Sequence, residues 1–370
     1  MGLQDNTTPH SGDANSKVRV LIVDDSAFMR TALARLLRTS DRIEVIETAR
    51  NGQEGLDKAK ALKPDVVTLD IEMPVLDGLT ALRRIRSECS PPPAVLMCSS
   101  LTREGSHEAL KALGLGAADI IAKDGSNFSM HMDAMRDDLV EKVLAIAAGA
   151  ARKATTSLAA GTVSSKPVKF RPGEFDLICI GSSTGGPPVL ETLIAALPAS
   201  LACPVLIAQH MPVMFTKSLA ERLGEDTKLK VRHGEHGMAV EDRTIYMAPG
   251  GLHTRIMRKA GKLVLDISDE PKSAVYRPSV NELFRSASEV GASRVLAIVC
   301  TGMGDDGAVG AKALKATGKA FIIAQDMPSC VVYGMPKAVA QAGLADASLP
   351  PDEIARALRT LGSGSGTLAA

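Results

Sequence analysis

The sequence has no marked excess of either charge and no long apolar run. Lysine and arginine number 43 and aspartate and glutamate 42, so the formal charge of the 370-residue chain is +1. This balance supplies no basic field for nucleic acid and no polybasic stripe for anionic lipid. No apolar stretch approaches the ~20 residues that a membrane helix needs. We therefore expect neither nucleic-acid binding nor direct membrane insertion.

Cysteine is also sparse, with six residues and no CxxC motif. Cys98, Cys179 and Cys300 fall in apolar runs, which is typical of small reduced core residues and not of disulfides or zinc ligands. Residues 1–16 are polar and contain neither the basic nor the apolar region of a secretory signal. These absences predict a cytoplasmic protein.

Two stretches of the chain alternate short apolar, β-rich runs with amphipathic ones. The expected strands are 18–23, 43–49, 65–69, 94–98 and 119–122 in the first stretch, and 175–181, 204–209, 244–248, 294–300 and 320–324 in the second. This alternation predicts an α/β fold with two doubly wound parallel-sheet domains, over residues 17–147 and 174–360. Residues 148–173 are rich in Ala, Ser, Gly and basic residues and are interpreted as a linker, unless their Ala-rich start extends the preceding helix.

In the first domain, polar side chains follow four of the expected strands. They are Asp24 and Asp25, Asp70, Ser99 and Ser100, and Lys123. The carboxyl ends of parallel strands meet at one edge of a sheet, so these groups are expected to converge. Crowded carboxylates need a cation, and oxygen ligands suit Mg²⁺. A single such aspartate usually caps a helix, but three with a lysine favour a phosphoryl-acceptor site.

The DD pair, the segment DIEMPVLDG (70–78), the serine and the lysine resemble a response-regulator receiver domain. The resemblance implies a flavodoxin-like fold and phosphorylation of Asp70 by a histidine kinase. It further implies Mg²⁺ held by Asp24, Asp25 and Asp70, with Ser99 and Lys123 as switch residues. One departure from the family pattern is Asp124, which follows the lysine where proline is usual.

The second domain opens with ICIGSSTGGPP (178–188), a strand that runs into small residues. The loop matches neither the dinucleotide fingerprint G-x-G-x-x-G nor the Gly-Lys-Ser/Thr ending of a phosphate-binding loop. It does match G-x-S-x-G, a strand-to-helix turn that projects a serine, here Ser183. A helix N-terminus behind that serine would help to hold an oxyanion. The alternative is a plain strand-to-helix turn with small residues.

A serine nucleophile requires a base and an acid that orients it. Among the seven histidines, His210 directly follows an apolar strand in CPVLIAQHMP and so emerges at the same edge as Ser183. Three others in this domain are expected in polar or solvated turns: His233, His236 and His253. The acid candidates are Asp305 and Asp306 in TGMGDDGA, and spacing alone does not choose between them.

Together, GSSTGGPP, QHMP, TGMGDDGA and RPSVNELF (277–284) resemble the catalytic domain of the chemotaxis protein-glutamate methylesterases. The resemblance implies a Rossmann-like α/β esterase domain with the triad Ser183, His210 and Asp306. It gives Thr184 a supporting role near the histidine and assigns part of the oxyanion hole to the Met303 backbone N–H. No cofactor is implied for ester hydrolysis.

The resemblance also implies the substrate and its regulation. The substrate would be a glutamate methyl ester, or a glutamine amide, on methyl-accepting chemotaxis receptors. The unphosphorylated receiver domain would pack over the active-site rim until a histidine kinase phosphorylates Asp70. The alternatives are a phosphorylation-controlled docking or adaptor protein with a vestigial esterase site, and a DNA-binding response regulator, which the near-zero charge disfavours.

Overall fold

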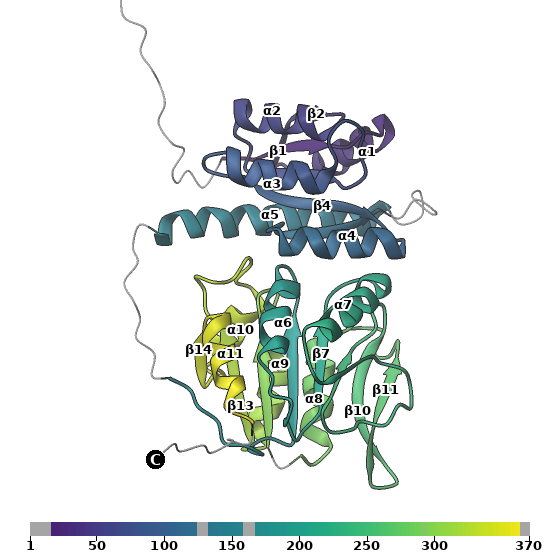
Figure 1. Ribbon diagram of the computed structural model, residues 1–370, viewed down its shortest axis with the longest axis vertical. Helices are drawn as coiled ribbons and strands as arrows, with labels where there is room; N and C mark the ends of the chain where they lie inside the picture. The colour runs from purple at the N-terminus through teal and green to yellow at the C-terminus, as the bar shows by residue number, and fades with distance from the viewer. Residues whose placement is uncertain (1–15, 124–131, 158–166, 293, 363–370) are drawn as a thin grey trace, which may run out of the picture.

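The computed structural model describes residues 16–123, 132–157, 167–292 and 294–362, and it contains two separate parallel sheets (Figure 1). Asp124, the departure from the receiver pattern, lies outside the described residues. No helix within the described ranges has both the length and the apolar character needed to cross a bilayer.

The first sheet has the order β2-β1-β3-β4-β5, with every pair parallel. This is the flavodoxin-like order 2-1-3-4-5. Its strands are β1 (Val18–Val23), β2 (Ile43–Ala49), β3 (Val66–Asp70), β4 (Ala94–Ser100) and β5 (Asp119–Lys123). Its helices are α1 (Ala27–Leu37), α2 (Gly52–Leu62), α3 (Gly78–Glu88), α4 (Arg103–Gly114) and α5 (Met132–Ser157).

Helices cover both faces of this sheet, which explains why its central strands are mostly apolar. Helices α1 and α5 pack on one face, and α2, α3 and α4 pack on the other. Each of α1 to α4 begins after a polar N-cap residue whose side chain accepts a backbone N–H of the first turn; these residues are Ser26, Asn51, Asp77 and Thr102. The caps fix where each loop leaves the sheet edge that carries the acidic residues.

The second sheet has seven parallel strands in the order β14-β13-β12-β6-β7-β9-β8. Its strands are β6 (Leu177–Ser182), β7 (Val205–Gln209), β8 (Lys230–His233), β9 (Thr244–Met247), β12 (Val295–Val299), β13 (Ala320–Gln325) and β14 (Ala347–Leu349). A separate antiparallel hairpin is formed by β10 (His253–Lys259) and β11 (Lys262–Ser268). The helices are α6 (Gly186–Ala195), α7 (Val213–Glu225), α8 (Val280–Glu289), α9 (Ala308–Ala316), α10 (Met335–Gln341) and α11 (Pro351–Arg359).

Helices α6, α7 and α11 cover one face of the second sheet, and α8, α9 and α10 cover the other. Both halves are therefore doubly wound parallel sheets, and the predicted fold class is confirmed. The hairpin and the short outer strands β8 and β14 were not predicted. The prediction for His253 is wrong, because this residue begins β10 and is fully buried instead of lying in a polar turn. His233 ends β8, and its ring is hydrogen-bonded to Thr216 Oγ1 at 3.0 Å.

The described residues between the two sheets form the end of a helix and, from residue 167 on, a packed stretch of chain. Helix α5 continues to Ser157, so the first part of residues 148–173 extends the preceding helix, as the alternative interpretation expects. Phe170 is buried against Phe175 and Phe321, with edge-to-face ring geometry, and its N–H donates to Thr360 Oγ1 at 2.8 Å. Residues near Phe170 are therefore anchored to the second domain.

Helix α4 of the first domain packs against α7 of the second (Figure 1). The hydroxyls of Ser106 and Ser218 are hydrogen-bonded at 2.7 Å, and both side chains are buried. At the edge of this contact Glu221 Oε2 accepts from Arg103 at 3.3 Å, and His107 Nε2 lies 3.3 Å from the same oxygen. These exposed pairs are worth at most about 1 kcal/mol each, so the buried helix contact carries most of the interface.

Candidate active site

Ser183, His210 and Asp306 all follow strands at one edge of the second sheet. Ser183 comes directly after β6, the strand that lies between β7 and β12. The ladder continues beyond the strand ends, because His210 N donates to Ser182 O and Ser183 N donates to Thr301 O, both at 3.0 Å. These backbone hydrogen bonds hold the loops after β6, β7 and β12 next to one another.

His210 and Asp306 form a direct pair. His210 Nε2 lies 2.8 Å from Asp306 Oδ2, and the two side chains are only 9% and 3% exposed. An ionised carboxylate only accepts, so Nε2 carries the proton and Nδ1 is left as the acceptor. Nδ1 is buried and has no hydrogen-bond partner among the described residues. The ring is therefore turned the other way round from the common triad, in which Nδ1 faces the acid.

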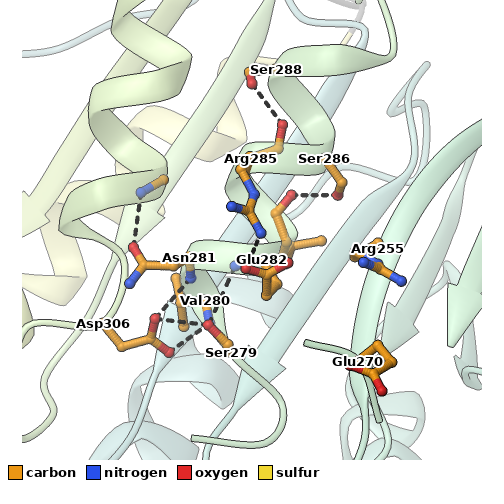
Figure 2. A network of polar contacts seen from close by, with 12 residues as sticks. Arg255, Glu270, Ser279, Val280, Asn281, Glu282, Arg285, Ser286, Ser288 and Asp306 are labelled. Carbon is orange, nitrogen blue, oxygen red and sulfur yellow. Dashed lines mark hydrogen bonds and ion pairs between the residues drawn. The ribbon is translucent and has the colours of Figure 1, made fainter. Parts of the chain in front are cut away.

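The Asp306 carboxylate is held by the start of α8, as Figure 2 shows. Its oxygens accept from Ser279 Oγ at 3.0 Å, Val280 N at 2.7 Å and Asn281 N at 2.8 Å. Burial by itself raises the pKa of Asp306, but His210 and the backbone N–H groups of Asn281 and Val280 hold that pKa below its ordinary value. Asp306 is therefore built to remain an anion.

Tyr276 covers the other side of the histidine. The rings of Tyr276 and His210 are stacked, with centroids 4.5 Å apart and planes 8° from parallel. Gln209, fully buried beside His210, accepts from Ser182 Oγ at 2.6 Å and donates to Ser183 O at 2.9 Å. Sequence reasoning missed both residues, although Gln209 stands directly before His210 in the same short motif.

The remaining predicted residues of the second site are placed as follows. Ser183 is half-buried, and the Cβ of a residue at Gly302 would lie 2.6 Å from its Cβ, so only glycine fits beside it. Met303 is partly buried and packs against an apolar cluster that includes side chains of the first domain and Val332 of the second. Thr184 Oγ1 donates to Asp119 Oδ2 of the first domain at 2.7 Å instead of supporting His210. Asp305, the other acid candidate, is exposed.

The first domain brings its predicted residues together at the carboxyl edge of its sheet. Carboxylate oxygens of Asp24, Asp25 and Asp70 lie within 4.8 Å of one another. Lys123 Nζ lies 2.7 Å from both Asp24 Oδ2 and Asp70 Oδ1. Burial raises the pKa of Asp70, which Lys123 opposes. Three hard oxygen donors with one lysine fit a site for Mg²⁺.

Ser99 is buried, and its hydroxyl is hydrogen-bonded to the start of α4. Its Oγ donates to Gly105 O, in the first turn of α4, at 2.8 Å. Any movement of Ser99 toward Asp70 must therefore break a contact with the helix that packs on the second domain.

A cavity of about 210 Å³ lies between the two domains, next to the candidate active site. Its walls combine residues of both domains: Asp119, Ile120, Ile121, Ala122, Met135, Asp138 and Lys142 from the first, and His210, Met211, Pro212 and Phe215 from the second. Within it, Lys142 Nζ lies 3.5 Å from Asp119 Oδ2. The first domain thus covers the sheet edge that carries Ser183 and His210.

These features define a class of protein: an α/β domain with a serine, histidine and aspartate at one sheet edge, joined to a receiver domain. Residues 178–358 match the model of the CheB methylesterase family, and residues 20–133 match that of the response regulator receiver domain.

Relatives extend this match to nearly the whole chain. A protein-glutamate methylesterase/protein-glutamine glutaminase of Lawsonia intracellularis is 43% identical over 349 residues, covering 91% of this chain and 97% of the relative. The protein of the same name from Bacillus licheniformis is 42% identical, with 93% and 98% covered. The crystal structure of the Thermotoga maritima CheB methylesterase catalytic domain is 40% identical, covering 50% of this chain and 98% of that one, with a TM-score of 0.48. The chain belongs to the protein-glutamate methylesterase/protein-glutamine glutaminase family.

Proposed function

We propose that this chain is a phosphorylation-activated hydrolase that removes methyl groups from glutamate methyl esters on methyl-accepting chemotaxis receptors, and that deamidates glutamines there. The observation that carries the proposal is the buried His210–Asp306 pair at 2.8 Å, on the strand end next to the one that presents Ser183. Relatives that match over nine-tenths of the chain are named as enzymes, so the adaptor alternative is not favoured.

In the proposed mechanism, Ser183 Oγ attacks the γ-carbonyl carbon while His210 Nδ1 accepts the hydroxyl proton. Asp306 keeps the imidazole in the tautomer with the proton on Nε2 and stabilises the imidazolium that forms. The Met303 N–H faces the developing oxyanion. The imidazolium then gives its proton to departing methanol, and water, activated by the same Nδ1, releases the acyl group from Ser183. With a glutamine substrate the same proton goes to ammonia.

We further propose that a histidine kinase donates a phosphoryl group to Asp70. Asp24, Asp25 and Asp70 would hold the Mg²⁺, which offsets negative charge on the transferring group when bound. Lys123, already paired with Asp24 and Asp70, supplies a second positive charge at the acceptor. Ser99 would then turn from Gly105 O toward the phosphoryl oxygens.

The domain contact supports inhibition of the unphosphorylated form. Asp119 accepts from Thr184, the residue after the proposed nucleophile, and the cavity lined by His210 is closed on one side by the first domain. Reversing a 1:99 equilibrium between closed and open forms takes about 5.5 kcal/mol. A single surface contact contributes less than this. We therefore expect phosphorylation to shift the equilibrium only in part.

A cytoplasmic location is part of the proposal. All six cysteines lie within the described residues, where they are buried and form no disulfide, as expected in a reducing compartment.

The decisive experiment measures methanol released from receptor membranes that carry methylated glutamates, with and without acetyl phosphate. Wild-type protein should release methanol faster when acetyl phosphate is present. Ser183→Ala should lower turnover by about 10³–10⁶-fold, while Asp70→Asn should keep the basal rate and lose the response to acetyl phosphate. Normal hydrolysis by a pure Ser183→Ala preparation would refute the assignment.

A further inference from the structure

We infer that Asn281 is a positioning residue of the His210–Asp306 pair, acting through the loop that carries Asp306. This inference rests on the proposed hydrolase function. Asn281 stands in the first turn of α8 and touches neither Ser183 nor His210 in any hydrogen bond of the described residues. Its backbone N–H nevertheless holds the Asp306 carboxylate, and its side-chain oxygen holds the residues that follow Asp306.

The backbone of Asn281 holds the carboxylate itself. Its N–H donates to Asp306 Oδ1 at 2.8 Å, next to the Ser279 hydroxyl, which donates to the same oxygen at 3.0 Å. Asp306 thus acts as a cap for the N-terminus of α8, where the positive end of the helix dipole favours an anion.

The side chain of Asn281 holds the chain that follows Asp306. Asn281 Oδ1 accepts from Gly307 N at 2.9 Å and from Gly310 N at 2.8 Å, at the start of α9. Helix α9 has no side-chain cap of its own, because its N-cap residue is Gly307. The side chain reaches these N–H groups because Gly310 lets the helices approach: a Cβ there would lie 2.8 Å from Asn281 O.

The two helices therefore exchange caps: Asp306, before α9, caps α8, and Asn281, in α8, caps α9. Gly304 and Gly307, on either side of Asp306, have φ of +72° and +103°, so the loop is built from residues with wide backbone freedom. Without the Asn281 oxygen, two N–H groups lose their acceptor and the carboxylate can shift relative to His210 Nε2. A displacement of about 1 Å near reacting groups can cost about 10²-fold in rate.

The test compares Asn281→Ala with the conservative Asn281→Asp and with Ser286→Ala in the full-length protein. Asn281→Asp keeps an acceptor oxygen at the start of α9. Ser286→Ala is the matched control, because its hydroxyl also accepts a backbone N–H, from Ile256 at 3.0 Å, on the same helix but away from the pair. We expect Asn281→Ala to lower kcat by about 10–100-fold with KM unchanged, while Asn281→Asp and Ser286→Ala stay within about 3-fold of wild type.

A double-mutant cycle separates positioning from general destabilisation. In an Asp306→Asn background, Asn281→Ala should have less than about a 3-fold further effect, because the group that it positions is already gone. A second loss as large as the first would overturn the inference, as would equal kcat losses for Asn281→Ala and Ser286→Ala.

An NMR measurement tests the role of Asn281 independently of the proposed hydrolase activity. The ring proton on His210 Nε2, held by Asp306, should give a downfield NMR resonance in wild-type protein and in Ser183→Ala. It should be lost or displaced in Asn281→Ala and kept in Asn281→Asp and Ser286→Ala. Inactive wild-type protein with this pattern would refute the substrate but support the role of Asn281. An unchanged resonance in Asn281→Ala would overturn that role whatever the activity.

Discussion

Asp306 combines two tasks in one carboxylate: it orients His210, and it caps α8 by accepting from Ser279 Oγ and two backbone N–H groups. Both tasks require the ionised form, because only the carboxylate accepts at every position. The hydrogen bonds that hold the pKa of Asp306 below its ordinary value must therefore contribute to folding stability as well as to catalysis.

The sign of this contribution gives a prediction for Asp306→Asn. A carboxyl group whose pKa is lower in the folded than in the unfolded protein stabilises the fold above its unfolded pKa, and this stabilisation is lost as the pH falls through the folded pKa. At pH 7 the variant should be less stable than wild type by about 1.5–3 kcal/mol, and the gap should shrink below about pH 4. Urea unfolding at several pH values measures this gap; a gap that widens in acid would contradict the prediction.

Converging strand ends in a parallel sheet pointed to Ser183, His210 and the pair Asp305 and Asp306, and the family resemblance chose Asp306. Neither revealed which histidine nitrogen faces Asp306, because ring orientation depends on contacts from the distant start of α8 and from Tyr276. His253 was misplaced because the two glycines shortly before it and the polar Thr254 and Arg255 after it are typical of a turn, although the residue begins a buried strand. Asn281 and Gln209 were missed although both lie in quoted motifs, since an amide side chain in a helix or strand is usually solvated.

Among the secondary-structure elements, α4 connects the two sites most directly. Its first turn is tied to the receiver site by Ser99 Oγ and Gly105 O, and one residue later Ser106 contacts Ser218 of α7. A movement of the Ser99 side chain therefore affects the same turn of α4 that contacts the second domain.

Replacing Ser106 with aspartate should open this contact. Ser106 is fully buried, and an unpaired charge there costs several kcal/mol, which exceeds what one surface pair returns. We expect Ser106→Asp to raise the methanol-release rate several-fold without acetyl phosphate and to reduce the further response to it. Ser106→Ala, which removes one hydrogen bond of about 1 kcal/mol, should change the basal rate much less. A Ser106→Asp rate equal to that of wild type would argue against occlusion through α4.

Elements with strong periodicity were predictable, and the short or polar ones were not. The buried parallel strands read as continuous apolar runs because helices cover both faces. The hairpin strand HTRIMRK carries five charged or polar residues among seven, and its core side, with Ile256, becomes evident only when α8 packs on it. β8 has four residues, KVRH, with half-exposed and exposed side chains, and is fixed only by pairing with β9.

In the whole molecule, the long helix α5 contributes a second contact between the domains. Gly149 of α5 is buried, and a Cβ at this position would lie 2.0 Å from Val331 O. No pattern in the sequence indicates this contact, because a glycine in an Ala-rich helix is equally compatible with exposure to solvent.

Gly149→Ala therefore has two opposed effects that can be measured apart. In a helix interior alanine is more stable than glycine by about 0.5–1 kcal/mol, so the first domain should not lose stability, whereas the steric conflict with Val331 should loosen the interface. We expect higher basal methanol release and a larger radius of gyration in solution scattering. Gly224→Ala in α7, where the nearest atom is 3.7 Å away, is the control with room for the methyl group. Unchanged scattering and activity in Gly149→Ala would count against the α5 contact.

The burial of every thiol has a practical consequence for following these domains. Burial raises the pKa of Cys98 to about 12 and also raises that of Cys179 and Cys300, so alkylating reagents should meet almost no reactive sulfur in the native protein. Cys89 and Cys98 lie in one half of the chain and the other four in the second half. The extent of alkylation of the cysteine peptides, measured by mass spectrometry, should therefore report the unfolding of each domain separately.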